Sequence, residues 1–486
     1  MIADLSLPHC RAAGQRSFLN WLKYDQYRKF MIFKRVHPFL VVTDVSNFFD
    51  SVLHSHVAEA LHGLPIPTRT VGLLFFLLER LSIRQEYAGS HGISLPVDEF
   101  DCSRTLAHMV LFPHDDEMVN LVKEENYVRW MDDQNMAVPS KAAGLKVLAK
   151  VGRSLSRLHL SPNAQKSKVL SLSEARRHFH LDFNKLLDEA DGIAKQVRAG
   201  SASKRALRKK VSEIWKKARI HEGDGEFAKV LKRLYRIAGL AGARQLRRRA
   251  TRDVLTDPSL ADRICDYMRC TGTVDEYLSF AMTIMWDAEQ VYPDVNVAIV
   301  KRLLRLEPSR ADGTRIRRLA VSLLSKDIDI PGAEHCAVVA PLLLLRFGDR
   351  RSLPLLKRMI EGVDRLASAD VVRACAIVYA SFGADCFRAV RKSASTLLRN
   401  HLSQTVRFVE EIQRYPTVPD RYKARLYVAN DPVAGRKFVD MRIMLMARLL
   451  LVGNSKKVTD WVANWKKKVL SECASEFDKR MVKRLL

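Results

Sequence analysis

The sequence contains few of the residues that mark disulfide-rich or disordered chains. Its 486 residues include only eight cysteines. None of them forms a CxxC pair, so a disulfide framework and a structural zinc site are both disfavoured. Glycine (21) and proline (17) are too scarce for a collagenous or linker-dominated chain. Apolar runs such as 72–78 and 336–345 are far shorter than the roughly 20 residues of a membrane span. No secretory leader follows Met1, so we expect a cytoplasmic protein with no membrane partner.

Acidic residues are also under-represented. The chain has 54 Asp+Glu against 81 Lys+Arg, a formal net charge of +27. Residues 1–175 carry only +2 of this, residues 176–250 carry +13 and residues 251–486 carry +12. A dense basic block favours polyanions, either nucleic acid or an anionic membrane surface, and the alternative is a solvated helix face. The phosphate-binding GxxxxGK[ST] loop and the GxSxG nucleophile elbow are both missing, which disfavours P-loop and α/β-hydrolase chemistry.

The first 175 residues have the pattern of a mixed α/β unit. The run FLVVTD (39–44) predicts a buried strand that ends at Asp44. The segment YVRWMDDQNMAV (127–138) predicts a hairpin with two aspartates at its tip. Residues 141–159 have helical periodicity, and 160–172 predict a turn followed by a strand.

Strand patterns almost vanish after residue 175. A basic amphipathic helix is predicted from Ala202, and we expect it to lie on a partner rather than to form part of a core. Its apolar stripe consists of Leu207, Val211, Ile214 and Ala218. Further on, residues 342–359 and 377–394 resemble each other at an offset of 35 residues, with a Phe-Gly pair between two apolar helices in each. A period of this size is typical of an α-helical repeat.

Three aspartates are the strongest candidates for chemistry. Asp44 follows a predicted strand, and Asp132 and Asp133 lie at a predicted hairpin tip. Nucleotidyl transfer uses two divalent cations, and Mg²⁺ is typically held by one or two carboxylates plus substrate phosphates. An isolated aspartate and an Asp-Asp pair are also common as helix caps and turn residues, so the surrounding sequence has to decide.

Four segments in a fixed order resemble the motifs of reverse transcriptases. DVSNFFDS (44–51) and YVRWMDDQNMAV (127–138) resemble the two catalytic motifs of the polymerase palm. GISLPVDEFDCSRTLA (92–107) resembles the motif between them, and LHLSPNAQKSKV (158–169) resembles the segment that follows. The best match is to the abortive-infection reverse transcriptases of bacteria, the AbiA/AbiK type and their prophage-encoded relatives.

This resemblance implies a fold with three parts. An α+β reverse-transcriptase-like palm with reduced fingers is expected over residues 1–180, because only 43 residues precede Asp44. A basic helical connector is expected over 181–250. An all-α, HEAT-like helical repeat domain is expected over 251–486, in place of a thumb.

The resemblance also implies roles for individual residues. Asp44 and Asp132 match the metal-binding carboxylates, and Asp133 matches the second acid of the pair. Val45 matches a residue whose backbone carbonyl binds a metal. Phe49 matches the aromatic steric gate, a ring that excludes a ribose 2′-hydroxyl.

Three further residues match nucleotide-binding positions. Ser103 and Arg104 match a Ser-Arg pair of the abortive-infection group, and Lys166 matches a lysine near the incoming triphosphate. Two departures stand out. Trp130 replaces the usual tyrosine or phenylalanine before the Asp-Asp pair, and residues 95–100 lack the usual PQG element. Because that element helps to position a template, its absence argues against templated synthesis.

By resemblance, the protein is therefore expected to be a DNA polymerase of anti-phage defence. The family pattern implies Mg²⁺, with Mn²⁺ as a substitute, and deoxynucleoside triphosphates as substrates. It also implies template-independent synthesis of single-stranded DNA from a protein hydroxyl, nucleic acid held on the basic helical domain, and homo-oligomers. Candidate primers are Tyr24, Tyr27, Tyr87 and Tyr127. The alternatives are a templated retron-type enzyme that uses a non-coding RNA, and a catalytically silent, nucleic-acid-binding helical scaffold.

A second polar cluster lies between the two catalytic motifs. Its members are His108, His114, Asp115 and Asp116. These residue types can bind a metal, but a solvated loop is the preferred interpretation of the segment.

Overall fold

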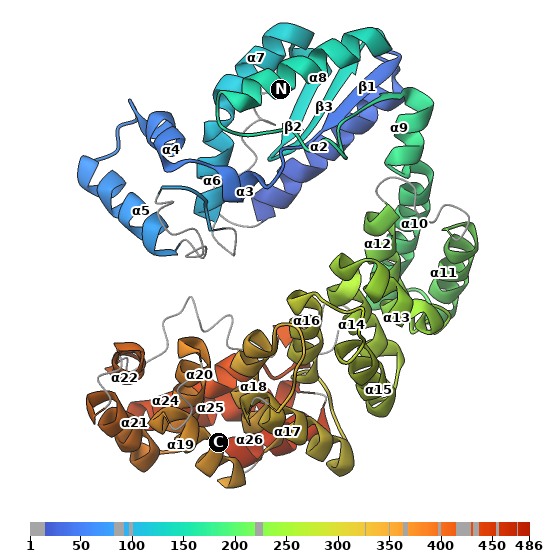
Figure 1. The fold of residues 1–486 in the computed structure, drawn as a ribbon. Coiled ribbons are helices and arrows are strands. Elements are labelled where there is room, and N and C mark those ends of the chain that lie inside the picture. The colour runs from blue at the N-terminus through green and yellow to red at the C-terminus, as the bar shows by residue number, and fades with distance from the viewer. Residues whose placement is uncertain are drawn as a thin grey trace. The chain divides into compact units, whose positions relative to one another are not determined.

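The computed structural model places most of the chain in two compact units, Met1–Leu181 and Asp182–Leu486 (Figure 1). The structure describes residues 15–81, 92–96, 101–218, 227–325, 327–348, 350–362, 368–396, 400–414, 429–430, 437–452, 456–473 and 475–486. Among these residues, no helix is both long enough and apolar enough to cross a membrane.

The first unit is a small antiparallel sheet with helices around it. Its four strands have the order β2-β3-β1-β4. The strands are β1 (Phe39–Thr43), β2 (Tyr127–Trp130), β3 (Asp133–Val138) and β4 (Lys168–Ser171). The helices are α2 (Gln15–Phe33), α3 (Phe48–Ser51), α4 (His54–Leu61), α5 (Thr68–Leu81), α6 (Asp101–Val110), α7 (Phe112–Val122), the 3₁₀ turn η1 (Glu124–Asn126), α8 (Lys141–Ser156) and α9 (Leu172–His178).

Helices cover both faces of this sheet because the strands alternate their apolar side chains between two cores. On β1, Val41 belongs to the core under α7 and α8, whereas Leu40 belongs to the core under α2 and α9. Figure 1 shows α7 and α8 on one side of the strands and α2 on the other. A strand that is buried on both faces is a near-continuous apolar run, which is the pattern that predicted β1.

The predicted strands and helix of this unit are confirmed. β1 ends one residue before Asp44, and α8 covers the helical stretch after the hairpin. β2 and β3 form the predicted hairpin, but its turn consists of Met131 and Asp132, because Asp133 is the first residue of β3 and pairs with Trp130. The turn and strand predicted over 160–172 correspond to β4, which pairs with β1. The small antiparallel sheet is therefore established, and its assignment to a polymerase palm stays a prediction.

The second unit is almost entirely helical. Apart from the two-residue strands β5 (Ala429–Asn430) and β6 (Lys437–Phe438), its described residues form helices and their connections. The helices are α10 (Leu181–Arg198), α11 (Lys204–Ala218), α12 (Phe227–Ala241), α13 (Arg247–Thr256), η3 (Pro258–Leu260), α14 (Ala261–Thr271), α15 (Val274–Met285), α16 (Pro293–Leu303), α17 (Arg310–Ser325), α18 (Ala333–Phe347), η4 (Arg350–Ser352), α19 (Leu353–Glu361), α20 (Ala369–Ala380), α21 (Ala384–Thr396), α22 (Asn400–Arg414), α24 (Met441–Val452), α25 (Lys456–Glu472) and α26 (Glu476–Leu485).

These helices stack in a repeat-like order. α12, α14, α16, α18, α20, α22 and α24 each pack on the next member of that series, and the helices between them pack alongside. Each of the two Phe-Gly pairs lies between two helices, as predicted, because Gly348 caps α18 before α19 and Gly383 precedes α21 after α20. One hydrophobic core runs through the whole unit, from Phe183 in α10 to Val482 in α26.

The basic helix predicted from Ala202 is α11, but its environment differs from the prediction. Its apolar stripe is completely buried in the core of the second unit, where α11 packs on α12. The helix is therefore part of a core, and only its charged faces remain at the surface. Residues 182–250 belong to the same compact unit as the helices that follow, and the three-part domain division stays a prediction.

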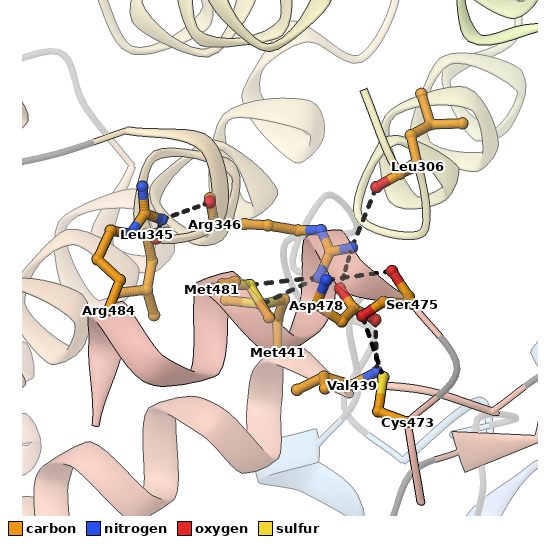
Figure 2. Close-up of polar contacts among 10 residues, drawn as sticks. All are labelled: Leu306, Leu345, Arg346, Val439, Met441, Cys473, Ser475, Asp478, Met481 and Arg484. Carbon is orange, nitrogen blue, oxygen red and sulfur yellow. Dashed lines mark hydrogen bonds and ion pairs between the residues drawn. The ribbon is translucent and has the colours of Figure 1, made fainter. Parts of the chain in front are cut away.

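A buried ion pair joins the C-terminal helices to the middle of this stack (Figure 2). The Arg346 guanidinium on α18 lies 2.7 Å from a carboxylate oxygen of Asp478 on α26, and both side chains are shielded from solvent. Arg346 also donates to the Leu306 carbonyl at 3.0 Å, and its second amino group faces the sulfur of Met481 at 3.4 Å. Asp478 in turn accepts from the Val439 amide at 3.1 Å.

Candidate active site

The three predicted aspartates lie at one end of the sheet. Thr43, the last residue of β1, is paired with Gln134 on β3, so Asp44 follows directly beside the start of β3 at Asp133. Trp130 pairs with Asp133, which leaves Met131 and Asp132 as the two residues of the hairpin turn. Antiparallel pairing therefore carries residues that are 88 positions apart to the same sheet edge.

The backbone at this edge is strained. Met131 has a φ of 55°, in the left-handed region that residues other than glycine, asparagine and aspartate rarely adopt. Among the described residues, seven non-glycine residues have positive φ, and four of them fall one in each of the four motif segments. The four are Asn47, Ser94, Met131 and His159. For residues other than asparagine, such conformations cost roughly 1–3 kcal/mol each and cluster at functional sites, so the positions of Ser94, Met131 and His159 are an independent reason to place a site here.

Asp44 is held from two sides by the segment that contains Lys166. The Asp44 carbonyl accepts from the Asn163 amide at 2.9 Å, and the Ser46 amide donates to the Ser161 carbonyl at 2.9 Å. The Asp44 residue is only 2% exposed, and its Oδ2 atom forms an ion pair with Lys166 Nζ. Its Oδ1 atom is buried and has no hydrogen-bond partner among the described residues.

All three carboxylates raise the pKa of Lys166. The hydrogen bond to Asp44 raises the pKa of Lys166, and the negative charges of Asp44, Asp133 and Asp132 raise it further, against the opposing effect of partial burial. The ammonium therefore lies in the combined field of the three acids. The structure brings together Asp44, Asp132, Asp133 and Lys166 from three separate segments of the chain. The Lys166 side chain itself is 64% exposed, so solvent screens this attraction.

A buried polar network around Arg129 holds the hairpin turn through the Met131 carbonyl. Sequence reasoning missed Arg129. Arg129 donates through Nε to Asp115 Oδ1 at 2.6 Å and through Nη2 to Asp115 Oδ2. Its Nη1 atom donates to the Met131 carbonyl at 2.8 Å, in the turn that carries Asp132, and to His108 Nδ1 at 3.0 Å. Tyr127 adds a hydrogen bond to Asp115 Oδ1 at 2.6 Å.

The electrostatics of this network keep Arg129 charged. Burial alone works against a charged guanidinium, but the Asp115 carboxylate outweighs burial and raises the pKa of Arg129. Burial and the same carboxylate both raise the pKa of Tyr127, so its hydroxyl remains a donor. An arginine on a strand is usually read as a surface residue. The signal that could have identified it is its position, two residues before the Asp132 turn and on the face that Tyr127 and Met131 bury.

The expectation of a solvated loop around His108, His114 and Asp115 was wrong. The segment forms α6 and α7, and these three side chains are buried, while Asp116 is exposed. His114 Nε2 donates to Gln134 Oε1 at 2.9 Å, and Nδ1 lies 2.9 Å from the Ser154 hydroxyl, which can donate to it when the ring is neutral. These partners suit a neutral ring, and burial lowers the pKa of His114. The three buried side chains thus support the hairpin internally, His114 through Gln134 on β3, and His108 and Asp115 through Arg129 on β2.

Val45 and Phe49 lie directly after Asp44 in the chain. Val45 is buried and bridges Pro162, within the same segment that holds Asp44. Phe49 is half-buried in the short helix α3, and its ring lies 5.4 Å from that of the buried Phe48. The Phe49 carbonyl accepts from the Leu95 amide at 2.8 Å, so the described part of the middle motif runs beside α3.

Ser103 and Arg104 lie on α6, which packs against α4 and α7. Ser103 is buried and Arg104 is half-buried. Their contribution to a nucleotide site stays a prediction. Most of the altered PQG region, residues 97–100, lies outside the described residues.

The candidate priming tyrosines differ in environment. Tyr24 is buried and accepts a hydrogen bond from Asn135 at 2.6 Å, and Tyr127 is buried against Asp115. Tyr27 is half-buried, and its hydroxyl donates to the Glu125 carbonyl at 2.8 Å. Tyr87 lies outside the described residues.

The carboxylates fit a cation that is shared with a substrate. Within the described ranges, no three side chains of His, Cys, Asp or Glu converge into a metal site. Mg²⁺ does not require three, because one or two carboxylates plus phosphate oxygens suffice. Asp44 offers a buried oxygen that lacks a partner in the described part of the chain, and its other oxygen already holds a cationic group. The donor chemistry and the local charge therefore suit a divalent cation.

No known protein family matches this chain, and no curated protein matches it. The function has to be inferred from the residues and contacts at the sheet end.

Proposed function

We propose that the protein is a reverse-transcriptase-like DNA polymerase of bacterial anti-phage defence, acting in the cytoplasm. The observation that carries the proposal is that strand pairing places Asp44, Asp132 and Asp133 at one end of the sheet, where Lys166 pairs with Asp44. Two further contacts support it. The segment around Asn163 runs beside Asp44, and residues 92–96 run beside Phe49, so the segment 44–51 is a neighbour of two other motif segments. On this proposal the first unit is the palm with reduced fingers, and the helical unit is a HEAT-like repeat.

The reaction is attack of a hydroxyl on the α-phosphorus of a deoxynucleoside triphosphate, with cleavage of the α–β phosphoanhydride bond and release of pyrophosphate. Asp44, Asp132 and the Val45 carbonyl would hold Mg²⁺, or Mn²⁺ in its place, and the bound cation would supply activation of the hydroxyl and neutralisation of the leaving group. Lys166 then provides a positive charge for the triphosphate. Asp133 adds negative charge beside the two metal-binding acids.

Three residues are assigned to nucleotide selection and binding. The Phe49 ring lies below the sugar and excludes a 2′-hydroxyl, while Ser103 and Arg104 contact the nucleotide or the nucleic acid. If Phe49 is the gate, Phe49→Ala raises the use of ribonucleotides relative to deoxynucleotides, on the order of tenfold. Unchanged discrimination would reassign Phe49 to core packing with Phe48.

The altered middle motif favours synthesis without a template, and the resemblance favours a protein hydroxyl as the primer and a homo-oligomeric assembly. Among the described candidate tyrosines, Tyr27 is the one whose side chain is not fully buried, so it is the first to test. A templated retron-type enzyme is the second candidate function, supported by the same carboxylates. A catalytically silent, nucleic-acid-binding scaffold is the third, supported by the basic charge of the helical unit.

One experiment separates these functions. Purified full-length protein is incubated with deoxynucleotides and Mg²⁺, with and without added RNA, and half of each product is digested with protease. Polymer that forms without RNA and shifts after digestion supports untemplated, protein-primed synthesis. Polymer that requires RNA supports the retron-type enzyme, and no polymer under any condition supports the scaffold.

The site assignment is tested with matched carboxylate variants. Asp44→Asn and Asp132→Asn abolish synthesis, and Asp133→Asn reduces it. Asp116→Asn is the control, because Asp116 is an exposed carboxylate of the same unit outside the site. Synthesis that survives Asp44→Asn or Asp132→Asn would show that the polymerising site lies elsewhere.

A further inference from the structure

α11 has an apolar face and two charged faces, and only one of the charged faces has its lysines paired with carboxylates. The first face is the buried apolar stripe. The second is an ion-pair face, on which Lys210 contacts Glu189 of α10 at 2.7 Å and Glu213 at 3.3 Å, while Lys217 contacts Glu213 at 3.1 Å. Residues 210, 213 and 217 share a face because helical neighbours recur at three and four positions. The positive charge on this face is largely neutralised by carboxylates.

The third face carries positive charge that is not paired with acids, because the neighbouring Glu213 already pairs with Lys210 and Lys217. It comprises Arg205, Arg208, Lys209, Ser212 and Lys216, at spacings of three, four, seven and eleven residues from Arg205. The four cationic side chains are exposed, and none of them forms an ion pair with another described residue. Arg208 is oriented by a hydrogen bond from Nε to the Ala241 carbonyl at 2.8 Å, which leaves its two amino groups available. At 1.5 Å per residue this basic face extends over about 16 Å.

The basic face borders a hollow and a second basic segment. A shallow hollow of about 520 Å³ is lined by Ser203, Arg205, Ala206, Arg208, Lys209 and Ser212. The loop before α13 lies alongside, because Gln245 Nε2 donates to Ser212 Oγ at 3.2 Å. Arg244 and Arg248, on either side of that contact, are exposed. The surface is thus a concave, hydroxyl-bearing strip with cationic side chains from two elements.

We propose that the basic face of α11, together with the Arg244–Arg248 segment, binds the phosphate backbone of nucleic acid. Guanidinium groups bind phosphate oxygens with two parallel hydrogen bonds, and a row of cations follows a row of phosphates without reading sequence. A membrane surface fits less well. Interfacial helices insert an apolar face into the lipid, whereas the apolar stripe of α11 is fully buried in the protein core. The inference builds on the proposed function, because a polymerase must hold the strand that it makes.

The test uses full-length protein and a fluorescein-labelled 20-nucleotide oligothymidine, with binding measured by anisotropy across a salt series. The variant is Arg205→Gln/Lys209→Gln, which leaves the hydrogen bond of Arg208 intact. The matched control is Lys210→Gln/Lys217→Gln, which removes the same charge from the ion-pair face. Thermal unfolding of all three proteins checks that each is folded.

The basic-face variant should bind on the order of tenfold more weakly at 0.1 M salt, and its slope of log K against log salt should be shallower by about 1.4. The control should bind within about twofold of the wild type, because paired lysines release few counterions. Equal losses in both variants, or none in either, would overturn the proposal. Binding to phosphatidylserine vesicles through the basic face, with no binding to the oligonucleotide, would overturn it in favour of a membrane.

The outcome is separable from that of the proposed function. Asp132→Asn should bind the oligonucleotide like the wild type while making no polymer. A wild-type protein that binds through the basic face but never synthesises would sink the polymerase and leave the inference standing. If the wild-type protein synthesises polymer normally but the basic-face variant binds the oligonucleotide as well as the wild type, the inference fails and the polymerase proposal stands.

Discussion

Replacing Arg129 with methionine should destabilise the hairpin that carries Asp132. Arg129 is 3% exposed and supplies four hydrogen bonds, two to Asp115, one to His108 and one to the Met131 carbonyl. Without Arg129, the buried Asp115 carboxylate would keep the hydrogen bond from the Tyr127 hydroxyl but lose both hydrogen bonds from the guanidinium. Removing one member of a buried ion pair typically costs about 3–5 kcal/mol, because the other charge is left uncompensated.

The measurement is hydrogen exchange by mass spectrometry on peptides that cover residues 127–138, which reports the free energy of local opening. Arg157→Met is the matched control, since Arg157 forms a 3.2 Å pair with Glu117 but its side chain is 71% exposed. Such surface pairs contribute about 0–1 kcal/mol. The double variant Arg129→Met/Asp115→Asn removes both charges and should therefore be less destabilised than the sum of its single variants.

Two results would refute this reasoning. If Arg129→Met lowered the free energy of local opening by less than about 1 kcal/mol, the buried Asp115 carboxylate would not need Arg129 to compensate its charge. Additive single variants would mean that the two side chains act independently. If the proposed function holds, Arg129→Met should also lower the turnover rate of synthesis, while Arg129→Lys, which keeps the charge but not the planar fork, should restore only part of it.

Three other perturbations have definite expected outcomes. Because burial lowers the pKa of His114 below 6.5, protonation of His114 favours the unfolded state. The free energy of opening of the first unit should therefore fall as the pH drops below about 6.5, by at most about 1.4 kcal/mol per pH unit. His114→Gln should flatten this pH dependence in hydrogen-exchange measurements, and equal slopes in the two proteins would contradict the assignment. Arg346→Met should cost the helical unit about 3–5 kcal/mol in denaturant unfolding, and Arg346→Met/Asp478→Leu should recover much of it; a double variant no more stable than the single would argue against the pair. Lys166→Met should lower the Mg²⁺ concentration needed for half-maximal synthesis, because the Lys166 ammonium no longer competes with Mg²⁺ for Asp44. The same variant should lower the maximal rate. An unchanged dependence on Mg²⁺ would count against a shared site.

Local sequence patterns were sufficient for the elements that bury a continuous or periodic apolar face. β1 and α8 are of this kind, and the hairpin turn that carries Asp132 is bounded by two strand-like arms. The long-range pairing of Asp44 with the hairpin was anticipated only because the motif segments resemble those of a known family. Nothing in the alternation of β1 itself specifies that Asp44 lies beside Asp133 rather than at the opposite end of a sheet.

The polar interior of the first unit could not be predicted from local patterns. His114 and Asp115 follow Pro113 in a polar stretch, which is the composition of a loop, and yet α7 turns both side chains inward. Whether a polar side chain is buried depends on partners that are distant in sequence, here Gln134 and Arg129. A single sequence does not identify those partners, because each polar residue is locally compatible with solvent.

The same limit explains the error over α11. A basic amphipathic pattern shows that one face is apolar, but it does not show what covers that face. In the structure the covering comes from the protein itself, with α12 packed on α11. The pattern also could not separate paired from unpaired lysines, because the pairing of Lys210 depends on Glu189 of the preceding helix. The charge that remains for a partner is therefore smaller, and more localised, than the composition suggests.

Two carboxylate–cation pairs of the first unit, Arg129–Asp115 and Lys166–Asp44, differ in a way that bears on function. Arg129 and Asp115 are both buried and are joined by a planar fork, so neither can leave without exposing a charge to a low-dielectric interior. Lys166 and Asp44 combine a buried carboxylate with a flexible, mostly exposed lysine. A site that accepts a cation needs a carboxylate that is already desolvated but held by a counter-ion that can be displaced. Asp44 meets both conditions and Asp115 meets only the first, which is why we assign chemistry to Asp44 and support to Asp115.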